Sequence, residues 1–348
     1  MLGRAKTTVG LDIGSHTIKV VEIEHKSEGP SLVKFGMAEL APEAIVEGEI
    51  MDRQLVVETI QNLFESLEIR RKQVASGVSG RGVIVKRITM ERLPPQEARE
   101  AIQWEAEQHV PYDINDVSLD FEILDTDVGP TQMQVLLVAA KRDLISSHAD
   151  LIREAGLLPA VIDVNSFAVQ NAAEVNYDFA KNEVVALVNI GGELTNVNLV
   201  QGGVPLYTQD LSLGGNGFVE ALQKKYQVSR EEALAALRVH DGGPTLDVTS
   251  VVRSFCADLG VAIERSLVFL KSSGDSDRID RVLISGGGAR IRGIAAGLAD
   301  RLKAPVEVVD SLRRVAFAPE PFHGNDPREV APQLMVGLGL ALRKAREK

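Results

Sequence analysis

The sequence predicts an α/β protein of about two domains. Its 348 residues are enough for a large core, and chains of this length commonly divide into two domains. Apolar runs typical of strands alternate with segments of helical apolar spacing, such as 218–226. A strand followed by a glycine turn and a second strand occurs at 8–23 and again from Val184. The two copies lie about half a chain apart, which indicates duplication rather than two unrelated hairpins.

The composition is that of an ordinary soluble globular protein, with 45% apolar and 25% charged residues. A net charge of −11 argues against a surface for nucleic acid or anionic lipid, which needs a basic excess. The single cysteine, Cys256, allows no internal disulfide and is expected to be a buried thiol. No signal-peptide core precedes Asp12, and the apolar run 334–342 is too short for a membrane span. We therefore expect a cytoplasmic protein.

The expected elements follow from the apolar spacing along the chain. Residues 8–78 form a β-meander and a helix at 54–66. Residues 79–160 form an insert with strands at 82–89, 118–124 and 132–139 and helices at 95–109 and 142–155. The meander recurs at 184–215, helices follow at 218–226, 230–239 and 250–271, and strands at 282–285 and 306–308. The stretch 319–327 is expected to be a loop.

The first repeat, TVGLDIGSHTIKVVEI at 8–23, places Asp12 at a glycine turn between two strands. In one interpretation the Asp and Gly residues simply supply hairpin turn chemistry. The second repeat, VVALVNIGGELTNVNLV, has Asn189 in the same place, and a third glycine turn follows the strand at 282–285. Glycine turns let backbone N–H groups approach a phosphate, and Ser15, Thr17 and Thr195 add hydroxyl donors. Asp12 is then predicted to hold Mg²⁺ through water.

These turns resemble the phosphate and adenosine loops of the actin, heat-shock chaperone and sugar-kinase superfamily, at 12–19, 189–196 and 285–293. The segments 163–175 and 332–348 resemble its two interdomain helices, the second with a small-residue face at Gly337 and Ala341. The resemblance implies an actin-like (ribonuclease H-like) two-lobed fold that binds ATP and Mg²⁺ in a central cleft. The expected nucleotide-binding residues are Gly14, Ser15, His16, Thr17, Lys19, Gly191, Gly192, Thr195, Gly214, Gly215, Asn216, Glu232, Gly286, Gly287, Gly288 and Arg290.

The insert narrows the resemblance to one branch of the superfamily. The string AIQWEAEQHVPYDIND and its surroundings at 94–164 resemble the PilM family of type IV pilus assembly proteins and, more distantly, the cell-division protein FtsA. This implies an inserted α+β subdomain at 79–160, a first lobe of 1–78, 161–183 and 325–348, a second lobe of 184–215 and 278–324, and a helical subdomain at 216–277.

The resemblance implies a cytoplasmic ATP-binding scaffold that docks the cytoplasmic N-terminal tail of PilN at the inner membrane. Other inner-membrane pilus assembly proteins are expected partners, contact with the membrane is only indirect, and a homo-oligomer stays open. The alternatives are an FtsA-like filament former of cell division or secretion, or a small-molecule kinase, for which no motif supplies a catalytic base. FtsA has an amphipathic membrane helix after the second connector, where this sequence ends at Lys348, so no direct anchor is expected.

Two positions depart from an active ATPase of this superfamily. Asn189 stands where the second phosphate loop usually has Asp, and Asn165 stands where the first connector presents an acid or amide near the γ-phosphate. An amide cannot accept a proton as a carboxylate does, which leaves Asp12 as the clear carboxylate of the cleft. We expect ATP binding with weak or absent hydrolysis. Asn165 has an alternative role as a helix N-cap.

Several candidates keep a structural alternative. The backbone N–H groups of Gly214, Gly215 and Asn216 can face a nucleotide from a helix start. Glu232 either accepts ribose hydroxyls or lies on a solvated helix face. Lys19 contacts phosphate or is a surface strand residue, His16 is at an exposed turn tip, and Arg290 stacks on adenine or lies at the surface.

The predicted partner face lies where the insert meets the first lobe, and the expected contact residues are Trp104, Gln108 and Val85. Ala98, Ile102 and Ala106 form the apolar stripe of the helix at 95–109. Trp104, the only tryptophan, points about 200° away from Ile102. It either packs against an insert strand or anchors a partner. An extended tail is expected along a strand edge such as 82–89.

Overall fold

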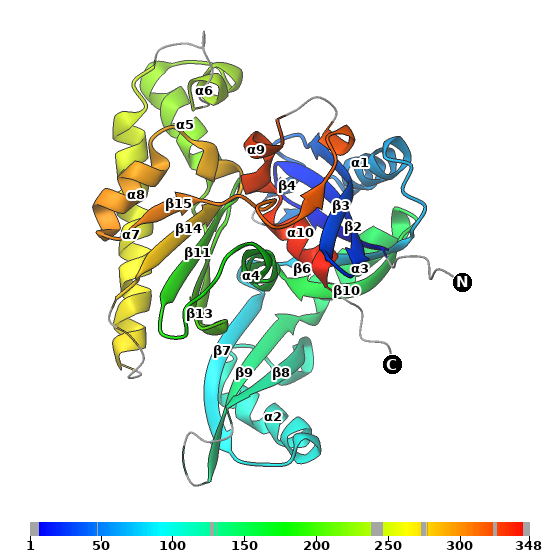
Figure 1. Ribbon diagram of the computed structural model, residues 1–348, viewed down its shortest axis with the longest axis vertical. Coiled ribbons are helices and arrows are strands. Elements are labelled where there is room, and N and C mark those ends of the chain that lie inside the picture. Colours follow the sequence, from blue (N-terminus) through cyan, green and yellow to red (C-terminus); the bar gives the residue numbers. More distant parts are fainter. Residues whose placement is uncertain are drawn as a thin grey trace.

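The protein consists of two lobes, each built on one sheet, with a smaller three-stranded unit beneath them (Figure 1). The computed structural model describes residues 7–46, 48–125, 129, 131–237, 246–272, 276, 278–322 and 326–343. Three buried clusters lie in the first lobe, the second lobe and the insert, and a fourth joins residues of both sheets, as expected of a large core in a chain of this length.

The first lobe has a six-stranded sheet in the order β10-β6-β1-β2-β3-β16. Its strands are β1 (Thr7–Ile13), β2 (Thr17–Lys26), β3 (Gly29–Glu39), β6 (Gln73–Val78), β10 (Leu158–Val164) and β16 (Ala316–Phe317). A short hairpin, β4 (Ile45–Val46) with β5 (Glu49–Ile50), precedes α1 (Arg53–Ser66). The helices of this lobe are α1, α3 (Arg142–Glu154), α4 (Asn165–Asn176), α9 (Pro327–Val330) and α10 (Met335–Leu342), with short η3 (Glu320–Phe322) and η4 (Ala331–Gln333).

The second lobe has a five-stranded sheet in the order β13-β12-β11-β14-β15. Its strands are β11 (Val184–Ile190), β12 (Thr195–Gln201), β13 (Val204–Leu211), β14 (Arg281–Ser285) and β15 (Val306–Val308). Its helices are α5 (Gly215–Tyr226), α6 (Arg230–Leu237), α7 (Thr249–Ser272) and α8 (Ile294–Leu302), with η2 (Gly287–Arg290) after β14. Every residue of β11 is buried, which explains its continuous apolar run.

The two sheets repeat the same arrangement, so the duplication predicted from the sequence is confirmed. β1 pairs antiparallel with β2 and parallel with β6, and β11 pairs in the same way with β12 and β14. Asp12 lies opposite Lys19 in the first sheet, and Asn189 lies opposite Asn196 in the second. The glycine turns therefore lie at equivalent edges of the two sheets.

Two helices pass between the lobes, as the sequence predicts. A Cβ on Gly10 of β1 would overlap the carbonyl oxygen of Gly337 in α10, so the small-residue face lets helix and strand touch. A Cβ on Gly339 would overlap the carbonyl group of Ala168 in α4, so the two helices also cross in backbone contact. All of α10 from Met335 to Ala341 is buried, as expected of a helix that is apolar all round.

The insert is an antiparallel sheet, β7 (Val83–Glu91), β9 (Gln132–Lys141) and β8 (Val117–Asp125), covered on one face by α2 (Pro95–His109). Proline at its first position suits the start of α2, and the short helix η1 (Ile114–Asp116) leads into β8. The predicted stripe of Ala98, Ile102 and Ala106 is buried against the sheet, as expected.

The structure differs from the predicted segment boundaries at two places. The sequence predicts an insert that runs to residue 160, but Leu151 and Ile152 of α3 are buried in the first-lobe core and β10 is a strand of the first sheet. It predicts a second lobe that runs to residue 324, but β16 already pairs with β3. The sequence analysis predicts the helix that corresponds to α3, but neither β10 nor β16, and apolar spacing does not show on which core an element packs.

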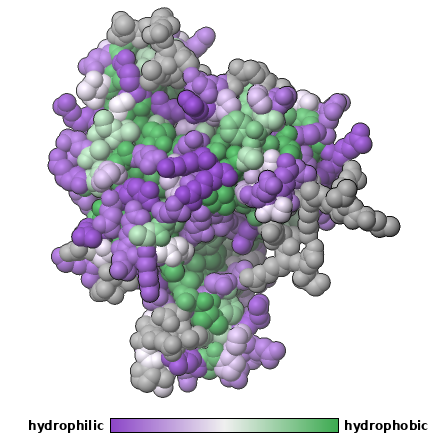
Figure 2. All heavy atoms as spheres, in the orientation of Figure 1, coloured by the Kyte–Doolittle hydropathy of each residue, from purple (hydrophilic) through white to green (hydrophobic). Residues whose placement is uncertain are grey.

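The surface in Figure 2 is largely hydrophilic, with apolar residues gathered over the insert sheet and between the lobes. None of the helices in the described residues is long and apolar enough to cross a membrane.

Candidate functional site

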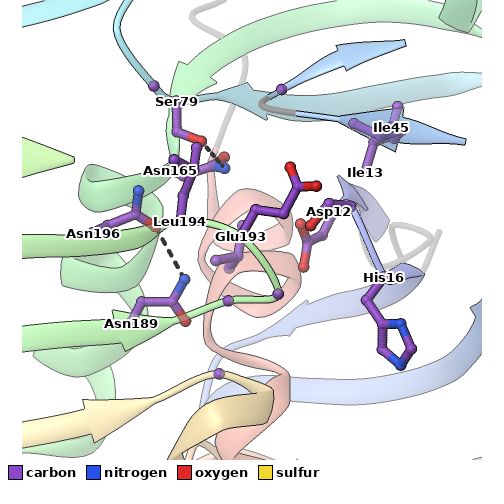
Figure 3. Close-up of a pocket in the computed structure, with 18 of the residues that line it drawn as sticks. Asp12, Ile13, His16, Ile45, Ser79, Asn165, Asn189, Glu193, Leu194 and Asn196 are labelled. Carbon is purple, nitrogen blue, oxygen red and sulfur yellow. Dashed lines mark hydrogen bonds between the residues drawn. The ribbon is translucent and has the colours of Figure 1, made fainter. Parts of the chain in front are cut away.

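A cavity of about 790 Å³ lies between the lobes, where β1, β11 and β14 end at glycine turns. We call these turns loop 1 (residues 12–19), loop 2 (residues 189–196) and loop 3 (residues 285–293). Figure 3 shows residues of loops 1 and 2 facing one another across the cavity. The predicted residues that line it are Asp12, Gly14, Ser15, His16, Thr17, Lys19, Asn165, Asn189, Gly191, Gly192, Gly215, Asn216, Gly286, Gly287, Gly288 and Arg290.

Loop 1 contributes a buried ion pair. Lys19 Nζ lies 3.0 Å from Asp12 Oδ2, and both side chains are about nine-tenths buried. The turn is closed by the N–H group of Gly14, which donates to the carbonyl oxygen of Thr17. Lys19 is therefore not the surface residue of the alternative interpretation, because it faces the cavity beside Asp12.

Loop 2 packs directly on loop 1. A Cβ on Gly192 would lie 2.9 Å from Ser15 Oγ, so the absence of a side chain here leaves room for loop 1. The N–H groups of Gly215 and Asn216 donate to the carbonyl oxygens of Gly191 and Gly192 at 2.8 and 2.7 Å. The expectation that these two N–H groups face a nucleotide is wrong, because they brace loop 2 instead.

Three predicted residues lie outside the cavity wall: Thr195, Gly214 and Glu232. The Thr195 hydroxyl is buried and donates to the carbonyl oxygen of Leu213 at 2.5 Å. Glu232 accepts from the N–H of Ser229 at 2.8 Å in a capping box of α6, and these hydrogen bonds lower the pKa of Glu232. Thr195 and Glu232 thus stabilise loop 2 and α6. The Ser229–Glu232 spacing is a capping-box signature in the sequence, whereas the partner of Thr195 lies 18 residues away along the chain.

Loop 3 touches loop 2 through glycines. Gly286 has φ +84°, and a Cβ there would overlap the carbonyl oxygen of Ile190. A Cβ on Gly288 would overlap the Ile190 side chain. Gly287 has no loop 1 or loop 2 atom near its missing Cβ and lines the cavity, as does Arg290, whose guanidinium lies 3.7 Å from Glu329.

The Asn189 amide is hydrogen-bonded at both ends. Its Nδ2 donates to Asn196 Oδ1 at 3.0 Å, and its Oδ1 accepts from Ser285 Oγ at 3.1 Å. Asn196 in turn donates to Asp210 Oδ1 at 2.6 Å, and the N–H of Gly80 donates to Asp210 Oδ2 at 2.5 Å. Burial raises the pKa of Asp210, and these two hydrogen bonds oppose the shift. Asn196 and Ser285 lie in the predicted loops but were not singled out as site residues, and Asp210 was not predicted as part of the site.

Asn165 presents an unused acceptor to the cavity. It is the first residue of α4, where no side chain makes a capping hydrogen bond, so the N-cap alternative is wrong. Its Nδ2 donates to Ser79 Oγ at 3.2 Å (Figure 3), while its buried Oδ1 has no partner in the described part of the chain. A Cβ on Gly77 would overlap this oxygen, so glycine leaves it room. This oxygen can therefore accept from a ligand or water in the cavity.

Glu193 of loop 2 is a cavity residue that the sequence analysis did not single out. It lines the cavity, and Figure 3 shows its carboxylate extending into the space between Asn165 and Asp12. The clue in the sequence was an acidic residue directly after the two glycines of loop 2. Asp12 is therefore not the only carboxylate on the loops around the cavity.

These donors fit a hydrated Mg²⁺ rather than a protein cage. Among the described residues no group of three or more acidic, His or Cys side chains could hold a metal ion. Asp12 supplies one carboxylate at the wall, and Asn165 Oδ1 is an oxygen that accepts from no donor within the described part of the chain. Mg²⁺ is usually bound through one or two carboxylates, waters and substrate phosphates, so this donor set is compatible with it.

The cavity continues to the junction of the insert with the first lobe. This arm is lined by Arg81, Tyr112, Lys141 and Leu144, together with the β4–β5 hairpin. Tyr112 donates to the carbonyl oxygen of Arg81 at 2.7 Å, and Lys141 Nζ lies 4.6 Å from the Tyr112 ring centroid. The arm therefore has an aromatic and cationic wall.

The three predicted partner residues do not form one surface. Trp104 is 72% exposed, so it is not packed in the insert core as the structural alternative held. Trp104 and Gln108 lie on α2, which covers the face of the sheet that carries Ile88 and Met90. Val85 points to the opposite face, because side chains alternate along β7.

Comparison with known families gives a match over nearly the whole chain. The model of the family described as type IV pilus assembly protein PilM matches residues 10–345. A solved structure described as a PilM-PilN type IV pilus biogenesis complex is 29% identical, with a TM-score of 0.84, and the match covers 98% of this chain and 99% of that chain.

Two further relatives are more distant. The cell division protein FtsA of Bacillus subtilis (strain 168) is 24% identical over 250 residues, and this match covers 65% of the present chain but only 56% of FtsA. The ethanolamine utilization protein EutJ of Carboxydothermus hydrogenoformans is 17% identical, with a TM-score of 0.59 over 97% of this chain and 90% of that one. Together with the duplicated sheets, these matches confirm the expected actin-like fold.

Proposed function

Because the chain belongs to the type IV pilus assembly protein PilM family, we propose that it is an ATP-binding scaffold of a pilus assembly complex at the inner membrane. The observation that carries the nucleotide part is the cavity where three glycine loops meet around Asp12, Lys19 and Asn165 Oδ1, an oxygen that accepts from no donor in the described residues. Such loops let a phosphate approach the backbone closely.

Each loop has a distinct part in this proposal. Ser15 and Thr17 of loop 1 offer hydroxyl donors. The ammonium group of Lys19, which pairs with Asp12, can pair with a phosphate group instead. Asp12 would hold a hydrated Mg²⁺ through its waters, and the ion would neutralise phosphate charge. Gly287 and Arg290 of loop 3 line the end of the cavity next to α6, where the nucleoside would lie.

We propose binding with little hydrolysis. Both polar atoms of the Asn189 amide are hydrogen-bonded within the second lobe, so they do not polarise an attacking water. Asn165 can orient a water through Oδ1 but cannot accept its proton. A site that holds nucleotide without fast turnover suits a scaffold whose conformation depends on what is bound.

The partner we propose is the cytoplasmic N-terminal tail of a PilN protein, docked in the arm of the cavity between the insert and the first lobe. In support, the similar solved structure is that of a PilM-PilN complex. Tyr112, Lys141 and Leu144 give the arm apolar area and a cation, which suit a short segment of apolar and polar side chains. The tail would hold the chain at the cytoplasmic face of the inner membrane.

Two experiments test this function. Thermal melts with and without Mg-ATP are expected to show a higher Tm with nucleotide, by about 2.7 kcal/mol of stabilisation at 100 times the Kd. No shift would contradict the nucleotide site. A synthetic tail peptide is then titrated into wild type, Leu144→Asp and the matched surface variant Trp104→Ala. Loss of binding only in Leu144→Asp supports docking in the arm. Loss of binding only in Trp104→Ala would show that the tail docks on α2 instead.

A further inference from the structure

A row of polar side chains crosses the cleft edge of the second sheet. Ser285 of β14 pairs with Asn189 of β11, Asn189 with Asn196 of β12, and Asn196 with Asp210 of β13. Their side chains are hydrogen-bonded in the same order, at 3.1, 3.0 and 2.6 Å. Ser285, Asn189 and Asn196 are buried, so these bonds are shielded from water.

The row ends on the segment where the chain enters the insert. Gly80 lies between β6 of the first sheet and β7 of the insert, and its N–H donates to Asp210. Its neighbour Ser79 accepts from Asn165, whose other amide atom faces the cavity. Gly80 has φ +96°, a conformation that favours glycine.

The two ends of the row determine its direction. A backbone N–H can only donate, and an ionised carboxylate can only accept. Asp210 therefore takes one hydrogen from Gly80 and one from Asn196, so the Asn196 carbonyl must point to Asn189. Asn189 must then donate through Nδ2, which leaves its Oδ1 to Ser285.

We propose that Asp210 is a positioning residue of the nucleotide site: through Asn196 it completes the hydrogen bonds of the Asn189 amide that hold loop 2 in place, and it ties that loop to the entry of the insert at Gly80. The inference rests on the proposed binding of nucleotide in the cavity. It also explains why loop 2 carries an amide at position 189, since the row has room for one carboxylate and Asp210 supplies it.

Counting donors and acceptors gives a specific expectation for each variant. In Asn189→Asp a carboxylate stands on each side of Asn196, at position 189 and at Asp210. The NH₂ group of Asn196 can donate to only one of them, and its carbonyl oxygen then faces the other, so one hydrogen bond of the row is lost. In Asp210→Asn all the amides can reverse, because the Ser285 hydroxyl can accept as well as donate. In the double variant the reversed row is complete again. The new carboxylate at position 189 accepts from Asn196, and the new amide at position 210 accepts from Gly80.

The test measures Tm without nucleotide and the Kd of Mg-ATP for wild type, both single variants and the double variant. We expect Asn189→Asp to lower Tm and weaken Mg-ATP binding about tenfold, which is 1.4 kcal/mol. Asp210→Asn and the double variant are expected to stay within about twofold of wild type. Rescue of one substitution by the other is not expected of two independent structural residues.

Asn198→Asp is the matched control. Asn198 is buried on β12, the strand of Asn196, but its amide is hydrogen-bonded to Gln170 and Thr208 instead of to members of the row. Asp210→Asn is expected not to rescue it. A double variant no better than Asn189→Asp, equal rescue of Asn198→Asp, or an Asn189→Asp protein that behaves as wild type would overturn the positioning role. If wild type binds no Mg-ATP, the proposed function itself fails, and the positioning role fails with it.

Discussion

Lys19 Nζ lies 3.0 Å from Asp12 Oδ2 at the wall of the cavity, and the two residues face each other on paired strands β1 and β2. Because both side chains are buried, each needs the other as its counter-charge. A phosphate group near Lys19 and a hydrated cation near Asp12 would satisfy the same two charges separately. The pair is therefore a charge-balanced state of the site before ligand binds.

Asp12→Ala is expected to abolish the stabilisation by Mg-ATP. It also leaves the Lys19 ammonium buried without a counter-charge, which costs about 3–5 kcal/mol of unfolding free energy. Thermal melts of Asp12→Ala alone would mix these effects. The Asp12→Ala/Lys19→Met variant removes both charges, so its own Tm should recover while the Mg-ATP shift stays absent. A full Mg-ATP shift in the double variant would show that neither residue contacts the ligand.

ATP turnover is expected to be slower than about 1 s⁻¹, the low end of ordinary enzymes. Asn189 is engaged by Asn196 and Ser285, so Glu193 is the remaining loop 2 side chain that could accept a proton from water. The rate of ATP hydrolysis, measured as released phosphate, should be lower still in Glu193→Gln. The Kd of Mg-ATP should change less than this rate. Turnover of 1 s⁻¹ or faster in wild type would refute the assignment of a weak site.

His148 is expected to make stability fall in mild acid. Burial lowers its pKa from 6.5 to about 4, and Ser76 Oγ lies 2.9 Å from its Nε2. Because the folded pKa is the lower one, the unfolded chain binds the extra proton, and stability decreases as pH falls from 6.5 to 4. The loss is about 3 kcal/mol. Urea unfolding of wild type and His148→Gln between about pH 7 and 4.5 measures it; parallel curves would contradict the neutral buried imidazole.

Gly339→Ala is expected to destabilise the protein by about 3 kcal/mol, because its Cβ would overlap the Ala168 carbonyl group where α10 crosses α4. Gly217→Ala in α5 is the matched substitution, since a Cβ there meets nothing within 4 Å. That variant should gain about 0.5–1 kcal/mol from helix propensity. Denaturant unfolding of both proteins checks the pair. Equal effects would show that the helices can separate without cost.

Local sequence patterns were enough to identify most of the elements and the loops. The 3.6-residue spacing of α2 and the glycine turns after β1, β11 and β14 depend on neighbours along the chain, so they can be read directly. The repeat of Asp12 and Asn189 at equivalent turns likewise placed both residues beside the cavity. Each of these patterns involves residues that are only a few positions apart along the chain.

The partners of each polar group were decided only by the tertiary structure. Thr195 and the N–H groups of Gly215 and Asn216 have the right chemistry for a nucleotide, but carbonyl oxygens of neighbouring segments already accept from them. Glu232 differs, because its partner Ser229 is only three residues away in the capping box of α6. Asp210 and Gly80 are 130 residues apart and meet only when the insert folds against the second lobe. A donor that is already hydrogen-bonded is not available to a ligand. Which of several suitable partners it uses depends on distances that only the packing determines.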